Sequence, residues 1–282
     1  MIKIVECPRD AMQGWPVYIP TATKINYLNT LLQVEFDTLD FGSFVSAKAI
    51  PQMQDTRDVL AGLQLQNTST KLLAIVANLR GAQQAADYPE ITYLGFPLSL
   101  SETFQQRNTN KTVAAALIEL AQIQEICLAK NKVLVVYLSM GFGNPYHEPW
   151  SPEVVWHLVQ QLVPLQIQII ALSDTVGVAT PATISILFSE LVPAFPAITF
   201  GAHFHTRPDN WEEKVKAAYE SGCTRFDGAL KGFGGCPMAK DELVGNLATE
   251  NLVAFFQNIN LPLRLNKIAF NAALAQAPVV FI

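Results

Sequence analysis

Short apolar runs rich in β-branched residues recur along the chain and alternate with stretches of helical periodicity. The eight apolar runs, each a predicted strand, are residues 2–7, 38–41, 71–77, 91–96, 132–138, 166–172, 198–203 and 224–228. The clearest helical stretches between them are residues 24–32, 112–129, 153–163, 181–191 and 210–221. Continuous apolar strands joined by crossover helices indicate a parallel sheet that is buried on both faces. Eight repeats predict closure into a (β/α)8 TIM barrel, with an open doubly wound sheet as the alternative.

The chain continues past the eighth run with two more helical stretches, residues 246–258 and 265–275. They predict a short C-terminal helical extension, and no low-complexity linker separates it from the barrel. We therefore expect one catalytic domain over residues 1–282, with the barrel in about residues 1–245 and the C-terminal helices in about 246–282. The apolar segment 268–282 predicts a packed terminus, with a subunit contact in a homodimer as the alternative.

Composition narrows the class of protein further. Half of the 282 residues are hydrophobic and 15% are charged, which supplies a large core and excludes intrinsic disorder. A formal net charge of −5 without a dense basic stripe argues against nucleic acid as a partner. Four widely spaced cysteines suit a reducing compartment better than a disulfide framework. Without a signal-peptide pattern or an apolar run of roughly 20 residues, we expect a cytoplasmic protein with no membrane contact.

Polar residues gather at or just after the C-terminal ends of the predicted strands. They are Arg9 and Asp10 after the first, Asp40 and Ser43 at the second, Asp174 at the sixth, His203 and His205 at the seventh, and Cys236 after the eighth. In a TIM barrel this end of the strands carries the active site. The sequence therefore predicts one site that combines two imidazoles, several carboxylates, an arginine and a thiol.

A metal site is the first chemistry that this set of residues predicts. His203 and His205 are two positions apart in an extended segment, so their side chains project from the same face. Asp10 and Asn246 are the candidate oxygen ligands that complete a chelating set. Imidazole, carboxylate and amide oxygen together favour Mg²⁺ or Mn²⁺, with Zn²⁺ not excluded. The alternative is two histidines that only satisfy backbone groups.

Three other residues are candidates for catalysis. A guanidinium at Arg9 can stabilise a developing oxyanion, and the alternative is an ordinary surface ion pair. Cys236 lies in a loop with several glycines, which predicts a loop that closes over a ligand and a thiol that transfers a proton, or else a simple turn with an incidental thiol. Asp174 is interpreted as a proton carrier or as a residue that hydrogen-bonds to a metal ligand. The third interpretation, a cap for the helix that begins after Thr180, is the weakest because the separation is too great. The other three cysteines are interpreted as structural.

Six motifs taken together resemble a known family. They are Val-Glu-Cys-Pro-Arg-Asp at 5–10, Ser-Phe-Val-Ser-Ala-Lys at 43–48 followed by Pro-Gln-Met at 51–53, Asp-Thr-Val-Gly at 174–177, His-Phe-His at 203–205, Gly-Gly-Cys-Pro at 234–237 and Gly-Asn-Leu-Ala-Thr-Glu at 245–250. In order and spacing the set closely resembles the 3-hydroxy-3-methylglutaryl-CoA (HMG-CoA) lyase family of the DRE-TIM metallolyase superfamily. The similarity runs from the first strand to about residue 256.

The resemblance implies a metal-dependent retro-Claisen cleavage of an acyl-CoA to acetyl-CoA and acetoacetate. It assigns metal ligation to Asp10, His203, His205 and Asn246, enolate stabilisation to Arg9, proton transfer to Cys236, an acidic site residue to Asp174, and to Asp40 a position where the family usually has Glu. Gln13 and Ser43 lie in the matched motifs and are candidate substrate-binding residues. The physical chemistry agrees, since breaking this bond requires removal of a hydroxyl proton and stabilisation of a carbanion.

The chain also departs from the family pattern. Gly14 and Trp15 replace an Asn and a Glu, Thr206 follows the His-x-His motif in place of Asp, and one extra residue lies between Cys236 and Asn246. None of these changes removes a predicted ligand. Together with Asp40 they leave a related 3-hydroxyacyl-CoA as an alternative substrate.

Two other functions remain as alternatives to the lyase. One is a condensing acyltransferase of the isopropylmalate-synthase type, and the other is a barrel that binds a metabolite without catalysis. No dinucleotide-binding glycine motif and no P-loop is present, which argues against nucleotide chemistry. Lys48, Arg80, Arg107 and Lys111 are candidates for contact with CoA phosphates, but each is equally well interpreted as a surface charge, so none is assigned.

Overall fold

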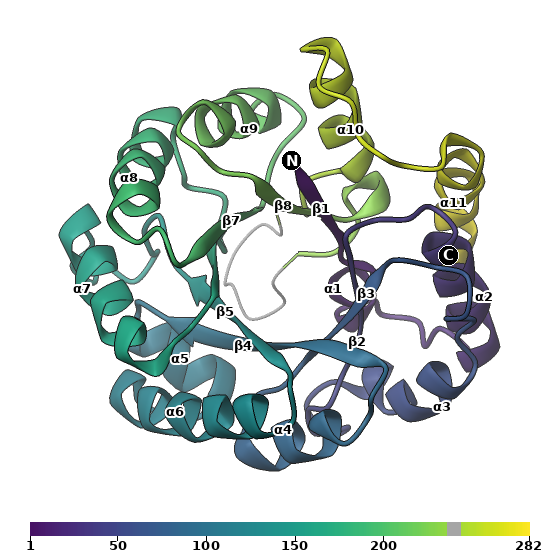
Figure 1. The fold of residues 1–282 in the computed structure, drawn as a ribbon, viewed down its shortest axis with the longest axis horizontal. Helices are drawn as coiled ribbons and strands as arrows, with labels where there is room; N and C mark the ends of the chain where they lie inside the picture. The colour runs from purple at the N-terminus through teal and green to yellow at the C-terminus, as the bar shows by residue number, and fades with distance from the viewer. Residues whose placement is uncertain (236–243) are drawn as a thin grey trace.

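A closed barrel of eight parallel strands forms the centre of the computed structural model, which describes residues 1–235 and 244–282 (Figure 1). The strands are β1 (Lys3–Glu6), β2 (Thr38–Ser43), β3 (Lys71–Ile75), β4 (Ile91–Ser99), β5 (Val133–Ser139), β6 (Ile169–Asp174), β7 (Thr199–Phe204) and β8 (Arg225–Gly228). Each strand pairs with the next in sequence, and β8 pairs with β1. This closure confirms the predicted TIM barrel and excludes the open sheet.

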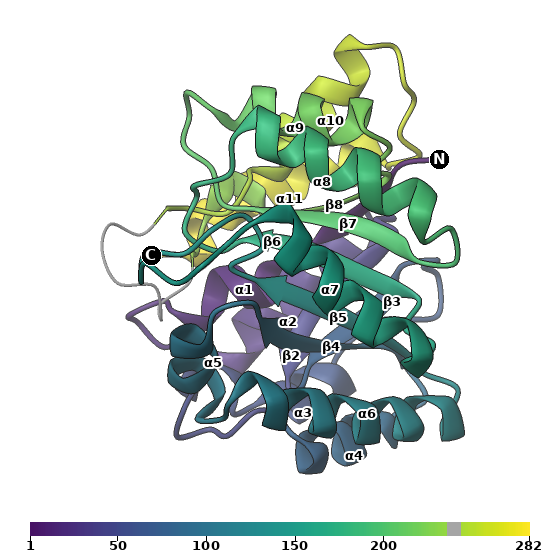
Figure 2. The ribbon, with the colours of Figure 1, turned by 90° about the vertical axis from the view of Figure 1, so that its left-hand side faces the viewer.

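Eleven α-helices lie in the described part of the chain, and most of them surround the barrel (Figure 1). They are α1 (Pro8–Gln13), α2 (Thr21–Leu32), α3 (Thr56–Ala61), α4 (Leu79–Ala86), α5 (Glu102–Thr109), α6 (Val113–Ala129), α7 (Pro152–Leu162), α8 (Pro181–Ala194), α9 (Trp211–Glu220), α10 (Thr249–Asn258) and α11 (Lys267–Val280). In side view the strands cross the middle of the molecule, between α8, α9 and α10 on one side and α3, α4 and α6 on the other (Figure 2).

Short 3-10 turns complete the described secondary structure: η1 (Pro51–Met53), η2 (Val163–Leu165) and η3 (Leu230–Gly232). In the described ranges no single helix has the length and apolar character needed to cross a membrane, and α5 with α6 reaches them only as a pair bent by 58°.

The helices that the sequence analysis did not predict are short. The sequence analysis placed Arg9 and Asp10 after the first strand without predicting a helix there, and both lie in α1. Pro8 occupies the first turn of α1, where its fixed φ favours a helix start and its missing N–H costs nothing. A helix of six residues has too few turns to show periodicity in the sequence. The consequence for the site is that Arg9 and Asp10 leave β1 on a rigid turn.

Two layers of apolar side chains hold the barrel together. The larger core lies between the strands and the surrounding helices. The smaller core fills the inside of the barrel with Leu73, Tyr93, Val135, Tyr137, Ile169 and Ala171. A packed interior of this kind leaves the carboxyl ends of the strands as the place where a ligand can enter.

The C-terminal helices α10 and α11 confirm the two predicted helical stretches, although α10 begins three residues later and α11 runs to Val280. α11 packs against α2 and η3, and Figure 1 shows it beside α2 at the edge of the molecule. This extension therefore contacts the part of the barrel that precedes the predicted cysteine loop.

Candidate active site

A cavity of about 480 Å³ opens at the carboxyl ends of the strands, where the sequence predicted the site. Four of the predicted site residues that line it lie on or just after β1 and β2 or in α1: Arg9, Asp10, Gln13 and Ser43. His203 and His205, from β7 and the residue after it, line the same cavity. The predicted convergence of distant segments on one cavity is therefore present in the structure.

Asp10, His203 and His205 form a group that can hold a metal ion. One potential ligand atom from each residue lies within 4.8 Å of the others. Asn246 pairs with His205 through an isolated antiparallel bridge, and its side chain hydrogen-bonds to Asp10. The structure thus brings together all four residues that the sequence analysis predicted as metal ligands.

The ionisation of this group suits a cation. Burial raises the pKa of Asp10, but Arg9 and then the two histidines outweigh it, and the pKa ends below its ordinary value. Burial and the neighbouring His203 lower the pKa of His205 to about 4. At neutral pH the site therefore offers an ionised carboxylate and a neutral imidazole, the forms in which these groups bind metals.

His203 is oriented by a carboxylate that the sequence analysis missed. Nδ1 of His203 lies 3.2 Å from Oδ2 of Asp227, and Asp227 is its direct partner in the pairing of β7 with β8. The imidazole also packs edge-on against the ring of Tyr137 at 5.6 Å between centroids. The signal for Asp227 was a carboxylate inside the predicted eighth strand, two positions after Arg225 and hence on the same face of the strand.

Arg9 is held by carboxylates on two sides. Its Nε and Nη2 donate to Asp40 Oδ2 at 3.0 and 2.6 Å, and its Nη1 donates to Asp10 Oδ1 at 2.9 Å and to Gln13 Oε1 at 2.9 Å. Burial raises the pKa of Asp40 to about 6 against the opposing effect of Arg9. Because Arg9 is buried and lines the cavity, the surface ion pair considered from the sequence is excluded.

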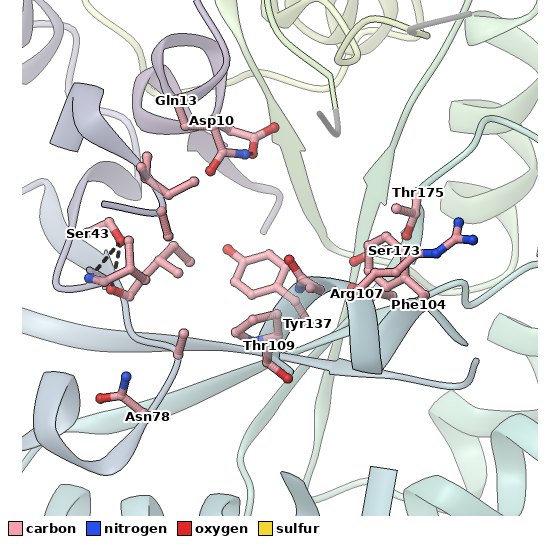
Figure 3. Close-up of a pocket in the computed structure, with 18 of the residues that line it drawn as sticks. Asp10, Gln13, Ser43, Asn78, Phe104, Arg107, Thr109, Tyr137, Ser173 and Thr175 are labelled. Carbon is pink, nitrogen blue, oxygen red and sulfur yellow. Dashed lines mark hydrogen bonds between the residues drawn. The ribbon is translucent and has the colours of Figure 1, made fainter. Parts of the chain in front are cut away.

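Gln13 and Ser43 lie at the wall of the cavity near these charges. Nε2 of Gln13 donates to Asp10 Oδ1 at 2.7 Å, which helps to fix the carboxylate. Ser43 ends β2 and donates through Oγ to the carbonyl of Ile75 at 3.3 Å. Both residues line the cavity and are labelled in Figure 3.

Asp174 points away from the cavity. Ser173 and Thr175 line the cavity, whereas the carboxylate between them accepts from Nζ of Lys214 at 2.7 Å and from the backbone N–H of Ala179 at 3.0 Å. Both side chains of this ion pair are buried. Asp174 is thus close in sequence to the cavity lining but is turned toward α9.

The described cysteines are all buried and free: Cys7, Cys127 and Cys223. Burial raises the pKa of each thiol, which agrees with the structural role that the sequence suggested. Cys7 also lies within 4.8 Å of His203 and Asp227, in a second group of potential ligand atoms that shares His203 with the first. Cys236, the predicted catalytic thiol, lies outside the described residues.

Tyr137 is a cavity residue that the sequence did not point to. It lies at the centre of Figure 3, between Ser43 and Ser173 and below Asp10. Its hydroxyl is buried without a hydrogen-bond partner in the structure as described. An orphan hydroxyl at the floor of a cavity is a candidate for contact with a ligand.

Arg107 and Lys111 place positive charge along another wall of the cavity, at the junction of α5 and α6. Arg107 stacks on the ring of Tyr146 with 4.7 Å between the guanidinium carbon and the ring centre. Lys111 pairs with Glu119. The sequence alone could not separate these two cations from Lys48 and Arg80, which are not among the lining residues.

Comparison with known proteins gives the family. The HMGL-like family model matches residues 2–275. The chain belongs to the HMGL-like family. Among curated HMGL-like relatives, hydroxymethylglutaryl-CoA lyase YngG of Bacillus subtilis is 34% identical over 90% of this chain and 84% of its own length. The (R)-citramalyl-CoA lyase of Chloroflexus aurantiacus is 29% identical over 96% of this chain and 88% of its own.

Solved structures similar to this fold include HMG-CoA lyases. An HMG-CoA lyase from Acinetobacter baumannii, solved with coenzyme A and 3-methylmalate, superposes with a TM-score of 0.92 and 31% identity over 100% of this chain and 91% of its own. The resemblance that the six motifs suggested is therefore confirmed over nearly the whole chain.

Proposed function

We propose that this HMGL-like protein is a metal-dependent lyase that cleaves HMG-CoA, or a closely related 3-hydroxyacyl-CoA, by a retro-Claisen reaction. The observation that carries the proposal is the convergence of Asp10, His203 and His205 beside the guanidinium of Arg9 in one cavity. HMG-CoA lyases among the relatives support the reaction class. The C3 hydroxyl gives its proton to a general base and becomes the ketone of acetoacetate, while the bond between C2 and C3 of the acyl chain breaks and its electron pair passes to the acetyl-CoA enolate.

A divalent cation is the cofactor that the family implies, and the residues present fit it. Asp10, His203, His205 and Asn246 supply one carboxylate, two imidazoles and an amide oxygen, a mixed donor set that favours Mg²⁺ or Mn²⁺. When bound, the ion supplies Lewis acidity that makes the substrate hydroxyl easier to deprotonate. Zn²⁺ stays a candidate on the same donor set.

Arg9 is proposed to stabilise the enolate. Its guanidinium cannot lose its proton, and its bonds to Asp40 and Asp10 fix its position before the substrate arrives. Donors that are fixed in advance stabilise developing charge without a cost of reorganisation. We assign Gln13 to hold Asp10 and to face the acyl group, with Ser43 as a further contact at the end of β2.

Cys236 is proposed to deliver the proton that converts the enolate carbon to the methyl group of acetyl-CoA. The proposal rests on the motif alone, because Cys236 lies outside the described residues. Asp174 was predicted as an acidic site residue, and its ion pair with Lys214 favours a positioning role in which it holds Ser173 and Thr175 against the cavity.

The CoA moiety is proposed to lie along the wall formed by Arg107 and Lys111. Both cations line the same cavity as the metal-binding group, so one elongated ligand can reach both. Arg107 is preorganised by its stacking on Tyr146, which suits contact with a phosphate. A CoA thioester is such a ligand, with its charged end at the cations and its acyl end at Arg9.

A substrate panel tests the function and separates it from the alternatives. Purified protein is stripped of metal, supplied with Mg²⁺ or Mn²⁺, and incubated with HMG-CoA and with citramalyl-CoA. Acetoacetate released only with metal supports the proposed reaction, whereas pyruvate from citramalyl-CoA would assign the activity of the other relative. Consumption of acetyl-CoA with a ketoacid would indicate a condensing acyltransferase. No turnover of any of these substrates would contradict an enzymatic role.

A further inference from the structure

Three aromatic rings from distant parts of the chain pack together beside the site. Trp15 follows α1, Phe233 follows η3 and Phe281 follows α11. Their ring centroids are separated by 5.8 Å (Trp15–Phe233), 5.2 Å (Trp15–Phe281) and 4.6 Å (Phe233–Phe281). We call these three residues the aromatic clamp. Trp15 is also one of the positions at which the sequence departs from the family pattern.

The clamp holds a backbone carbonyl that orients Asn246. The carbonyl oxygen of Phe233 accepts a hydrogen bond from Nδ2 of Asn246 at 2.9 Å. A primary amide binds a cation through its oxygen, so its nitrogen must be turned to an acceptor elsewhere. The carbonyl of Phe233 is such an acceptor, and its bond to Nδ2 holds the amide of Asn246 in one orientation beside the site.

Gly234, the residue after Phe233, lies very close to Asp10, Ala11 and Asn246. A β-carbon on Gly234 would lie 2.7 Å from Cα of Ala11 and 2.9 Å from both the carbonyl of Asp10 and Nδ2 of Asn246. These contacts leave no room for a side chain at this position. A shift of the segment at Phe233 and Gly234 would therefore reach Asp10 and Asn246 together.

We propose that Phe281 is a positioning residue for the metal site, because it holds Phe233 and thereby fixes the amide of Asn246. The inference rests on the proposed function insofar as it assumes a bound cation. Removing the ring of Phe281 leaves a void beside Phe233, because packed interiors relax only partially around a lost side chain. The carbonyl of Phe233 then loses its fixed position, and the site binds metal less tightly.

Phe270 offers a matched control in the same C-terminal segment. It lies in α11, eleven residues before Phe281, and packs against Phe36 with ring centroids 6.4 Å apart. Both phenylalanines are buried, with 9% of Phe270 and 6% of Phe281 exposed. Phe270→Ala thus removes the same kind of ring from the same C-terminal segment without touching the clamp.

The test measures Mn²⁺ binding to metal-free protein by calorimetry, together with the melting temperature, and needs no substrate. We expect Phe281→Ala to raise the Kd for Mn²⁺ about tenfold. Losses of this size are typical when a residue that orients a metal ligand is removed. Phe281→Leu should recover part of that loss. Phe270→Ala should lower the melting temperature similarly and leave the Kd within about twofold of wild type, since its ring lies outside the clamp.

Wild-type affinity in Phe281→Ala, or an equal loss in Phe270→Ala, would overturn the proposal. Should Phe281→Ala fail to fold, Phe281→Leu decides by the same comparison with wild type. A wild-type protein that binds no Mn²⁺ would remove the metal site itself, and the clamp inference with it. Normal Mn²⁺ binding with no lyase activity would contradict the proposed function and leave the inference about Phe281 intact.

Discussion

Asp227 faces His203 across the β7–β8 pairing, with its Oδ2 3.2 Å from the imidazole Nδ1. A carboxylate at Nδ1 keeps the proton on that nitrogen and leaves Nε2 free for a metal. Asp227 is 2% exposed, so water does not compete for this contact. The pair thus fixes both the tautomer and the direction of a predicted ligand.

Asp227→Asn should weaken Mn²⁺ binding by about 10- to 100-fold, because an amide holds the imidazole less firmly and less selectively than a carboxylate. Calorimetry on metal-free protein measures the change. Asp55→Asn is the control, since Asp55 is a buried carboxylate whose partner is Lys24 and not a predicted ligand. Equal losses in the two variants would contradict the orienting role.

Cys7→Ala tests which of the two groups of potential ligands that share His203 binds the ion. Cys7, His203 and Asp227 also lie within 4.8 Å of one another, so Asp227 could act as a ligand in that second group. If the ion binds at Asp10 and the two histidines, Cys7→Ala should change the Kd for Mn²⁺ by less than about twofold, because it removes no ligand. A loss as large as that of Asp227→Asn would assign the ion to the second group.

Tyr137→Phe tests the orphan hydroxyl at the floor of the cavity. The unfolding free energy should stay the same or rise slightly, because the variant removes a buried hydroxyl that has no partner. kcat/KM should fall about tenfold if the hydroxyl bonds to substrate, which corresponds to roughly 1.4 kcal/mol. Tyr93→Phe makes the same change inside the barrel, outside the cavity lining, and should leave kcat/KM unchanged. Unaltered kinetics in Tyr137→Phe would exclude the contact.

The sequence predicts those features whose cause is local. The eight strands follow from apolar runs, and the shared face of His203 and His205 follows from the two-residue repeat of an extended chain. The strand ends were less well predicted, since β4 and β5 continue to Ser99 and Ser139, where a polar residue ends the apolar run. Those serines belong to the strands because backbone pairing continues past the last apolar side chain.

Features that depend on distant neighbours could not be predicted in the same way. The bond from Arg9 to Asp40 joins residues 31 positions apart, and the pairing of His203 with Asp227 depends on the register of two strands. The direction of Asp174 depends on Lys214, which approaches from α9. Sequence patterns identify such side chains as candidates, but packing decides which of them face the cavity.

The buried carboxyl group of Glu6 should make the free energy of unfolding depend on pH. It is fully buried in β1, where it accepts hydrogen bonds from the backbone of Leu230 and the hydroxyl of Thr249. Burial raises its pKa from 4.5 to about 8, although the two hydrogen bonds act in the opposite direction. Between these values the folded chain holds a proton that the unfolded chain has released, so a rise in pH favours unfolding.

The free energy of unfolding should therefore fall by up to about 1.4 kcal/mol per pH unit from this group as the pH rises toward 8. Glu6→Gln imitates the protonated form and should remove that part of the slope. Urea unfolding of both proteins between pH 6.5 and 8 measures the difference, and the common contribution of other groups cancels. Parallel slopes for the two proteins would show that Glu6 is already ionised in the folded state.

The buried ion pair of Asp174 and Lys214 gives a way to separate positioning from catalysis. Lys214 donates to Asp174 at 2.7 Å and also to the carbonyls of Gly177 and His205 at 3.1 and 3.3 Å, so it ties the ends of β6 and β7 together. Removing one partner leaves a buried charge alone, which costs about 3–5 kcal/mol. Asp174→Asn and Lys214→Met should each lose stability on this scale.

The kinetics of the same two variants decide the role of Asp174. If Asp174 acts by holding Ser173 and Thr175 in place, both variants should lower kcat by similar factors, because each releases the same segment. A proton carrier would behave differently, since Asp174→Asn would lose about 10²-fold or more in kcat while Lys214→Met kept the carboxylate and most of the rate. The comparison is made at a temperature where both variants remain folded. Similar losses of kcat in the two variants indicate that Asp174 contributes to catalysis through its ion pair with Lys214, and a much larger loss in Asp174→Asn indicates proton transfer.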